Sequence, residues 1–530
     1  MPWAATIVLG SRRTAVQCVG VAQASVNASF SMLFNSWNFL VFMAVLLPLY
    51  YAPSASAGWQ LALLLAASAV FYAWESPWLL GLLIGSSSVS VFAAQQIVAN
   101  RWAAPSPGAQ PSGTLAAARR WLWLGVSINL LALLLFKYAP LLSALAPEWM
   151  LPSPARDWAL AIPLPVGISF YTFQGISLIV DAWRGDLPAA TKASLAAHGL
   201  GRSTSFRDAT FYLLFFPQLV AGPIVKAHDF LPQIGRKTRR DIDWLTARRA
   251  LVTGFFLKMV VADNLAEQTV PLALGTAGDM SMGALNLLAL IYAYSLQIFA
   301  DFAGYSLIAI GLSSLFGYTL SANFNFPYLA TTITDFWRRW HLSLSSWLRE
   351  YLYIPLGGNR RGDVRTYVNL FIVMFLGGLW HGAAWKYALW GTLHGVFLAV
   401  ERLVSRFRRA PASGSTLLAT AAPVFGWFFT FHVVTLLWLT FVMPDLHAIE
   451  KCLRAVACDP LGRPGAPVFA LLFYGTPVAL YHAWGALRER SAVLATRLLG
   501  SIAEPVIHGI MVFAIATNAG APRGFIYFQF

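Results

Sequence analysis

The stretch DFWRRWHLSLSSWLREYLYIPLGGNRRG, residues 335–362, decides how the chain can fold. It places one histidine among tryptophans and arginines in an otherwise apolar protein. A helical wheel gathers the large apolar side chains and this histidine on one face, which predicts a continuous amphipathic helix at a membrane–water interface. A histidine on the buried face needs a hydrogen-bond partner or a chemical role. That face holds Trp337, Trp340, His341, Leu344, Trp347, Leu348, Tyr351 and Leu352.

The composition is that of a membrane protein. Of the 530 residues, 58% are hydrophobic and only 11% are charged, whereas soluble domains carry about 25% charged residues. The net charge of +15 does not indicate nucleic-acid binding, because the basic residues fall in short loops between apolar segments, as the positive-inside rule requires. We therefore expect an all-α polytopic membrane protein.

Apolar segments of about 20 residues can each cross a bilayer, and the chain holds enough of them for about 11–12 crossings, since pairs such as 283–300 and 302–318 can form one bent helix. The stretch YLLFFPQLVAGPIVKA (212–227) contains two prolines and a glycine, which predicts a broken or re-entrant element. The other candidate crossings are 36–52, 59–74, 77–98, 121–143, 159–181, 247–264, 365–380, 383–402, 419–442, 467–485 and 502–518.

Residues 1–31 are small and weakly polar, and the first convincing apolar span begins at Met32. We expect 1–31 to be a poorly ordered extension outside the core rather than a targeting segment, and 32–530 to be a single membrane domain. Loop charge predicts the orientation. The basic loops 99–120, 228–250, 403–418 and 486–499 should face the cytoplasm, and the loops 264–282 and 444–466 should lie outside.

The chain has three cysteines and no CxxC motif, so the sequence supports no metal site. Cys452 and Cys458 share a loop predicted to lie on the oxidising side, which suggests a disulfide between them as a hypothesis.

The stretch FLGGLWHGAAWKYALWGTLHG, residues 375–395, places His381 and several glycines at the end of an apolar span. Polar side chains within spans are costly and usually face a bundle interior or a wet cavity, and glycine lets a ligand or another backbone approach closely. An imidazole can take and return a proton near neutral pH. We therefore predict that His381 and His341 are catalytic. The alternative for each is a helix–helix hydrogen bond.

The other histidines are expected to be structural. His394 lies thirteen residues past His381 and would point the other way on one continuous helix, and His432 should pack within the bundle. Surface positions are expected for His198, His228, His447 and His482.

Arginines are expected to cluster around His341 on the cytoplasmic side, where guanidinium groups suit the phosphates of coenzyme A; the alternative is anchoring to lipid headgroups. Asp335 precedes Arg339 by four residues, an ion-pair spacing on a helix, and Asp301 and Glu350 should each pair with an Arg or His. Trp340 and Trp380 are expected to form a dry wall around the histidines. The predicted donor-binding side chains are Asp335, Arg338, Arg339, Asn359, Arg360 and Arg361, with Arg349 in the same cluster.

These segments together resemble the membrane-bound O-acyltransferase family, most closely its bacterial branch of alginate O-acetyltransferase membrane subunits. The resemblance covers nearly everything from Met32 to the end. No GxSxG or HExxH motif points to a hydrolase instead. The matching segments are LPVGISFYTFQ (164–174), FFPQLVAGPIVKA (215–227), QIFADFAGYS (297–306), the run from 323 to 362, LGGLWHG (376–382) and FIYFQF (525–530).

The resemblance implies helices around a central tunnel, with the two family histidines at His381 and His341. It implies transfer of an acetyl group from cytoplasmic acetyl-CoA to an exported polysaccharide such as alginate at the bacterial inner membrane, with periplasmic partner proteins and no bound cofactor. Leu307 stands where family members often have an acid. The alternatives are a D-alanyl transferase acting on teichoic acid-like polymers and a proton-coupled transporter or export channel.

Overall fold

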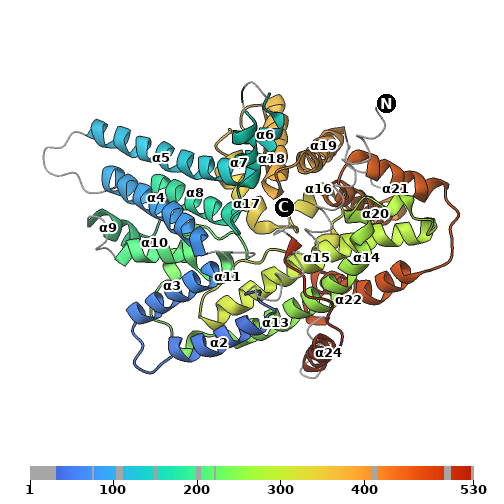
Figure 1. The fold of residues 1–530 in the computed structure, drawn as a ribbon, viewed down its shortest axis with the longest axis horizontal. Helices are drawn as coiled ribbons and strands as arrows, with labels where there is room; N and C mark the ends of the chain where they lie inside the picture. The colour runs from blue at the N-terminus through green and yellow to red at the C-terminus, as the bar shows by residue number, and fades with distance from the viewer. Residues whose placement is uncertain are drawn as a thin grey trace.

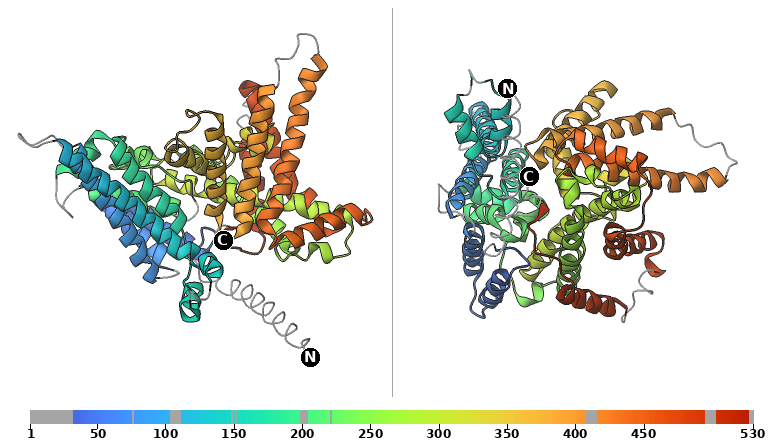
Figure 2. Two further views of the ribbon diagram at one scale, coloured as in Figure 1. Left: turned by 90° about the horizontal axis from the view of Figure 1, so that it is seen from above. Right: turned by 45° about the vertical axis from the view of Figure 1, so that its right-hand side comes forward.

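The computed structural model describes residues 32–74, 77–102, 111–147, 150, 152–197, 204–219, 222–407, 416–494 and 503–526. The predicted extension 1–31 lies outside this part. The described residues form helices and contain no strand, so the predicted all-α class is confirmed. The helices of the first part of the chain form one group, and those of the middle and last parts form two groups that interleave with each other (Figures 1 and 2).

The first group, blue to green in Figure 1, is built around three helices that pack against one another, α4, α5 and α8. A π-helical turn, η1, continues α5 into α6. The elements are α2 (Trp37–Tyr50), α3 (Ala57–Ala73), α4 (Pro77–Arg101), α5 (Pro111–Leu133), η1 (Leu134–Tyr138), α6 (Ala139–Leu145), α7 (Ser153–Ala161), α8 (Ile168–Arg184), α9 (Ala189–Ala197) and α10 (Thr204–Leu214).

The stretch 212–227 forms the predicted broken element. Helix α10 ends at Leu214, α11 (Phe216–Leu219) is a single turn, and α12 (Ala227–Phe230) follows an irregular passage. Other segments satisfy backbone groups of this passage: the Phe216 N–H donates to Ser68 Oγ at 3.1 Å, and the Tyr212 hydroxyl donates to the Val225 carbonyl at 2.7 Å. A buried irregular backbone is tolerated at membrane depth only with such partners.

The middle group centres on α15 (Ala284–Leu315), which joins the two candidate crossings 283–300 and 302–318 into one helix. It packs against α13 and α22. The preceding elements are η2 (Leu231–Gln233), η3 (Arg239–Asp241), α13 (Trp244–Phe255), the π-helix η4 (Phe256–Ala262), α14 (Asp263–Ala273) and η5 (Ala277–Asp279).

Asp301 on α15 is buried in a three-residue ion cluster. Lys258 Nζ lies 2.7 Å from both Asp301 Oδ1 and Asp263 Oδ1. The expected Arg or His partner for Asp301 is therefore wrong. A lysine can serve because two carboxylates together offset the cost of burying its ammonium group.

The last group contains the two informative stretches. Its elements are η6 (Pro327–Leu329), α16 (Ile333–Trp337), α17 (Leu342–Leu348), the π-helix η7 (Arg349–Tyr353), α18 (Asp363–His381), α19 (Trp385–Phe407), α20 (Thr416–Val442), α21 (Leu446–Cys458), α22 (Ala466–Arg490) and α24 (Ala503–Thr517). Helices α18 and α19 form an antiparallel hairpin, because Gly382 ends α18 in an extended conformation and the chain reverses before Trp385.

The hypothesis of a disulfide is wrong. Cys452 and Cys458 both carry free thiols, and the segment predicted as a loop forms α21. Six residues apart on one helix, the two side chains point in different directions: Cys452 is buried and Cys458 is exposed.

Five helices of the described chain are long and apolar enough to cross a membrane: Pro77–Arg101, Leu115–Leu145, Ala284–Leu315, Ala421–Val442 and Ala466–Arg490. Three shorter apolar helices accompany them: Trp37–Tyr50, Ala57–Ala73 and Ala503–Thr517. Several other predicted crossings, including α18 and α19, are helices with fewer apolar residues. The chain is thus a multi-pass membrane protein.

Two ion pairs agree with the predicted sidedness. Arg406 Nη1 lies 2.7 Å from Asp363 Oδ2, which joins the two basic segments predicted to be cytoplasmic. Lys451 Nζ lies 2.6 Å from Asp279 Oδ1, which joins the two segments predicted to lie outside.

The hairpin of α18 and α19 depends on two facing glycines. A Cβ added at Gly378 would collide with the Tyr387 carbonyl oxygen and approach Gly391 Cα at 3.0 Å. We expect Gly378→Ala to lower the stability of the fold by about 1–3 kcal/mol, a typical cost of overpacking, measured as a lower melting temperature in detergent. Gly85→Ala is the control, because a Cβ at Gly85 meets nothing within 4 Å. Equal melting temperatures for the two variants would contradict this close packing.

Candidate active site

His341 does not lie on a continuous helix. Helix α16 ends at Trp337, and His341 has φ 46°, in the left-handed region, immediately before α17. Such a conformation is uncommon for a residue other than glycine and is often found at functional sites. The predicted buried face is confirmed in part, because Trp340, His341, Leu344, Trp347 and Leu348 are buried, but the helix breaks at its centre.

The break turns the segment 333–358 into a re-entrant hairpin. One arm, α16, runs along α19: the Ile333 N–H donates to Glu401 Oε2 at 2.8 Å, and the Trp337 ring lies 5.2 Å from that of His394. The other arm, α17 and η7, runs along α18: Leu348 lies against Gly377, and Asn369 Nδ2 donates to the Gly358 carbonyl at 2.9 Å. His341 is the apex, at the level of His381.

The loop residue Asn323 holds the apex in place. Its carbonyl accepts the Leu342 N–H at 2.9 Å, and its side-chain Oδ1 accepts the Ser343 hydroxyl at 2.9 Å. Its Nδ2 donates to Ser306 Oγ at 3.1 Å. The Ser343 backbone N–H also donates to Oδ1, at 3.3 Å, which identifies Oδ1 as the acceptor, so His341 Nδ1, 3.1 Å from Oδ1, is the donor of that hydrogen bond. The basic nitrogen of His341 is therefore Nε2.

His381 is the last residue of α18 and meets His341 in the interior. The two ring centroids are 6.3 Å apart, and both side chains are buried. The structure thus places the two histidines that the sequence singled out in one enclosed interior. Trp390 and Phe441 also pack against the His381 ring, at 5.2 and 5.5 Å.

Aromatic side chains enclose the pair, as expected for Trp380 and Trp340. The Trp380 ring lies 5.8 Å from His341 and 5.5 Å from Phe173. Trp340 contacts Trp438 at 5.0 Å, and Trp438 in turn stacks on Trp390 at 5.2 Å. An apolar wall of this kind excludes water, which strengthens polar interactions within it.

Lys137 is a site residue that our sequence reasoning missed. It lies on η1, is almost fully buried, and its Nζ donates to the Trp380 carbonyl at 2.5 Å and to Ser169 Oγ at 3.1 Å. The last carbonyls of a helix lack helical partners and carry partial negative charge, so the ammonium group anchors the end of α18 beside His381. A single lysine inside the apolar run LLLFKYAP was the available signal.

His394 was placed wrongly. Because α18 and α19 are separate antiparallel helices, His394 faces the same interior as His381 rather than away from it. Its ring packs on Trp390 at 4.8 Å, and Trp337 Nε1 donates to His394 Nδ1 at 3.3 Å. Two histidines that we expected at the surface also have partners within the protein. His482 is buried and contacts the Val478 carbonyl, and His228 pairs with Asp181.

The predicted donor-binding side chains do not cluster around His341. Asp335 and Arg339 form the expected ion pair at 3.0 Å, and Arg339 also binds Glu489. Helices α17 and η7 separate this pair from the turn 357–362. The side chains of Arg338, Arg349, Asn359, Arg360 and Arg361 are exposed.

Glu350 pairs with Lys226 at 2.7 Å, not with an Arg or His. Lys226 comes from the broken element that precedes α12, which the sequence pattern did not place near η7. Among the described residues, no group of three or more His, Cys, Asp or Glu side chains is arranged to hold a metal ion.

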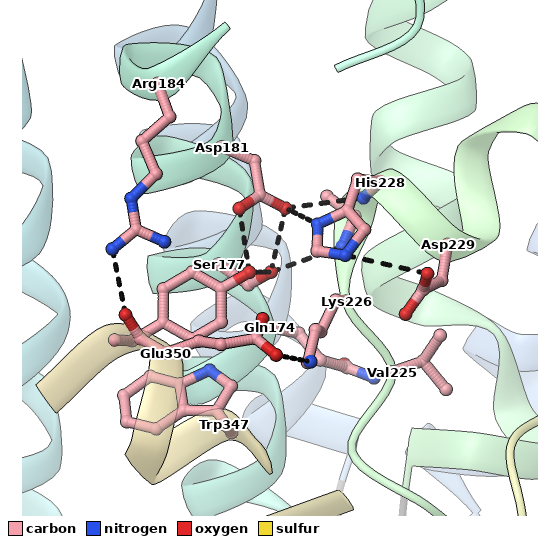
Figure 3. Close-up of polar contacts among 12 residues, drawn as sticks. Gln174, Ser177, Asp181, Arg184, Val225, Lys226, His228, Asp229, Trp347 and Glu350 are labelled. Carbon is pink, nitrogen blue, oxygen red and sulfur yellow. Dashed lines mark hydrogen bonds and ion pairs between the residues drawn. The ribbon is translucent and has the colours of Figure 1, made fainter. Parts of the chain in front are cut away.

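A buried carboxylate organises the neighbouring region, shown in Figure 3. Asp181 on α8 accepts the Tyr351 hydroxyl at 2.7 Å and contacts His228 Nδ1 at 2.9 Å. It thereby ties α8 to both η7 and α12. The hydrogen bond from Asp181 raises the pKa of His228 above its usual value, despite the opposing effect of partial burial.

Comparison with known proteins identifies the family. Residues 116–444 match the membrane-bound O-acyltransferase family. The chain belongs to this family. It is 39% identical over 430 residues to the probable alginate O-acetylase of Pseudomonas aeruginosa, which covers 80% of this chain and 75% of that protein.

Two more distant relatives match smaller parts of the chain. The peptidoglycan O-acetyltransferase of Helicobacter pylori is 34% identical, covering 74% of this chain and 73% of that protein. The teichoic acid D-alanyltransferase of Bacillus subtilis is 30% identical, covering 51% of this chain and 66% of that protein. The protein is therefore a membrane O-acyltransferase, an enzyme and not a transporter.

The Asn323 contact predicts a loss of activity when Asn323 is replaced. We expect Asn323→Ala to lower kcat by about 10-fold or more, because His341 loses the partner that fixes its tautomer and orientation, with little change in KM. The measurement is acyl transfer by purified enzyme. Asn286→Ala is the control, since Asn286 is a buried asparagine near the start of α15 whose amide donates to the carbonyls of Met282 and Arg463. Full activity of Asn323→Ala would contradict the assigned role.

The Asp181–His228 contact predicts a pH-dependent stability. Because the folded-state pKa of His228 is raised, its contribution is fully present below the ordinary histidine pKa and is lost as pH rises through the raised value. Asp181 and Asp229 favour the charged imidazole, and Lys226 opposes it. We expect the melting temperature in detergent to fall as the pH rises from the ordinary histidine pKa through the raised pKa of His228. In His228→Asn the melting temperature should fall less over the same range. His447→Asn, at an exposed histidine, should leave the profile unchanged; an unchanged profile in His228→Asn would contradict the assignment.

Proposed function

We propose that this enzyme transfers an acetyl group from cytoplasmic acetyl-CoA to hydroxyl groups of an exported polysaccharide such as alginate, at the bacterial inner membrane. The observation that carries the proposal is the meeting of His341 and His381 in a dry aromatic enclosure, with ring centroids 6.3 Å apart. The names of the relatives support the acetyl group and the polysaccharide acceptor.

In the proposed reaction, His381 removes the proton from the acceptor hydroxyl, whose oxygen attacks the thioester carbonyl. The carbon–sulfur bond breaks, and the departing thiolate takes up a proton. General-base catalysis of this kind contributes about 10²- to 10⁴-fold to a rate. An acyl-histidine intermediate is the alternative route to the same products.

The role of His341 follows from its tautomer. Nδ1–H is directed to Asn323, so the neutral ring presents a basic Nε2. This nitrogen accepts protons and does not donate to an oxyanion. Of the three roles open to His341, namely orienting the acyl group, stabilising the oxyanion and shuttling the proton, the structure favours the proton shuttle.

The arrangement supports transfer across the membrane. His381 lies at the end of α18 opposite Asp363 and the basic turn 357–362. If this turn faces the cytoplasm, as loop charge predicts, the donor enters from one end of α18 and the acceptor, or a periplasmic partner protein that relays the acetyl group, approaches from the other.

A D-alanyl transfer to teichoic acid-like polymers uses the same pair of histidines. It is less favoured, because the match to the D-alanyltransferase of Bacillus subtilis covers 51% of this chain, against 80% for the alginate O-acetylase of Pseudomonas aeruginosa.

The test is acetyl content of the exported polymer together with acetyl-CoA consumption by purified enzyme. We expect His381→Ala to lower both by about 10²-fold or more while the melting temperature stays close to wild type. His432→Ala is the matched control, since His432 is half-buried, bonds to a carbonyl of its own helix and packs on Tyr292 rather than on His341 or His381. Near-normal acetylation in a folded His381→Ala variant would overturn the proposal. Transfer from a D-alanyl carrier protein, but not from acetyl-CoA, would favour the alternative.

A further inference from the structure

One ion pair beside the candidate site connects the broken element before α12 to η7. Lys226 Nζ lies 2.7 Å from Glu350 Oε1, and Figure 3 shows the pair below the Asp181 cluster. Lys226 is 9% exposed. An ammonium group this deeply placed needs polar partners, because an unpaired buried charge is costly, and Glu350 supplies a carboxylate.

The backbone of Glu350 is held separately from its carboxylate, so the carboxylate can move on its own. The Glu350 backbone carbonyl accepts a hydrogen bond from Arg184 Nη2 at 2.8 Å, independently of the side chain. The Glu350 side chain is 31% exposed, compared with 11% for that of Lys226. The carboxylate can therefore turn toward solvent while the backbone of η7 stays in place, and the lysine cannot.

The pair lies on a direct route to the histidines. One helical turn before Glu350, the Trp347 ring stacks on Phe173 with centroids 3.8 Å apart. Phe173 contacts Trp380, and Trp380 contacts His341. Nine residues of helix separate Glu350 from His341, about 14 Å at 1.5 Å per residue. An extended phosphopantetheine arm spans a comparable length.

We propose that Lys226 binds the phosphate next to the pantetheine arm of the acyl donor, and that Glu350 occupies this position until the donor replaces it. The inference rests on the proposed function. A phosphate and a carboxylate are both oxyanions that pair with an ammonium group. The aromatic wall from Trp347 to Trp380 then guides the apolar arm to the histidines.

The proposal predicts opposite effects of the two halves of the pair. We expect Lys226→Gln to raise KM for acetyl-CoA about 10-fold, because it removes a charged contact to phosphate, and Glu350→Gln to lower KM, because it removes the competitor. A purely structural pair would give changes of the same sign, or a change in stability alone. Lys451→Gln and Asp279→Asn are matched controls in an ion pair at another part of the molecule.

A donor without phosphate completes the test. S-acetylpantetheine carries the same thioester and arm, so we expect Lys226→Gln and wild type to use it equally well. The proposal is overturned, while the proposed function stands, if Lys226→Gln raises KM equally for acetyl-CoA and for S-acetylpantetheine. It is likewise overturned if Glu350→Gln raises KM for acetyl-CoA. Should Lys226→Gln fail to fold, the direction of the Glu350→Gln effect still decides.

Two donors carry this phosphate: coenzyme A and the phosphopantetheine group of a carrier protein. The same variants are therefore assayed with an acetylated carrier protein. If Lys226→Gln raises KM and Glu350→Gln lowers it with one of these donors, the proposal is supported and that donor is identified as the carrier of the phosphate. A wild-type enzyme that consumes no acetyl donor overturns both this inference and the proposed function.

Discussion

The amide of Asn323 is the contact on which the arrangement of the site depends. It accepts hydrogen bonds at the point where α16 ends and α17 begins, and it accepts the Nδ1–H of His341. Leaving such buried groups without partners costs about 1–3 kcal/mol each, comparable with the cost of the left-handed backbone at His341. The strain and the hydrogen bonds offset each other, and the result is a sharp reversal with a histidine at its tip.

That reversal determines what surrounds the tip. The two arms of the hairpin lie along α19 and α18 respectively, so His341 is delivered to the end of α18, where His381 lies. Without the break between α16 and α17, the two arms could not lie along α19 and α18 with His341 between them. The facing glycines Gly378 and Gly391 let α18 and α19 approach closely enough for Trp390 to pack on His381.

Much of this site could be predicted from the sequence, because it depends on local patterns of residue type. The apolar segments indicated a helical membrane protein, and the glycine-rich end of a span indicated His381. The proline- and glycine-rich stretch 212–227 indicated its broken backbone. Asp335 and Arg339 pair as their spacing predicts, since the turn that follows α16 keeps Arg339 one helical turn from Asp335.

The remainder depends on contacts between distant segments, which no local pattern encodes. The break before His341 requires Asn323, and a helical wheel assumes that no such partner exists. His394 faces inward because the chain reverses after Gly382. Lys258, Lys226 and Lys137 find partners 43, 124 and 243 residues away in sequence, so periodicity could flag each buried charge but could not name its partner.

These three lysines also show how the fold handles positive charge at depth. Lys258 forms ion pairs with two buried carboxylates at 2.7 Å, one of which, Asp301, lies on α15. Lys137 meets a helix end and a hydroxyl, which fixes α18 beside His381. Lys226 alone is paired with a partly exposed carboxylate on a separate element. Of the three, it is the one whose partner is partly exposed, so that a ligand can replace that partner while the surrounding structure stays in place. A donor held there would keep its charged end near the exposed, basic side of η7 while its thioester lay in the dry enclosure, where water has little access to hydrolyse it.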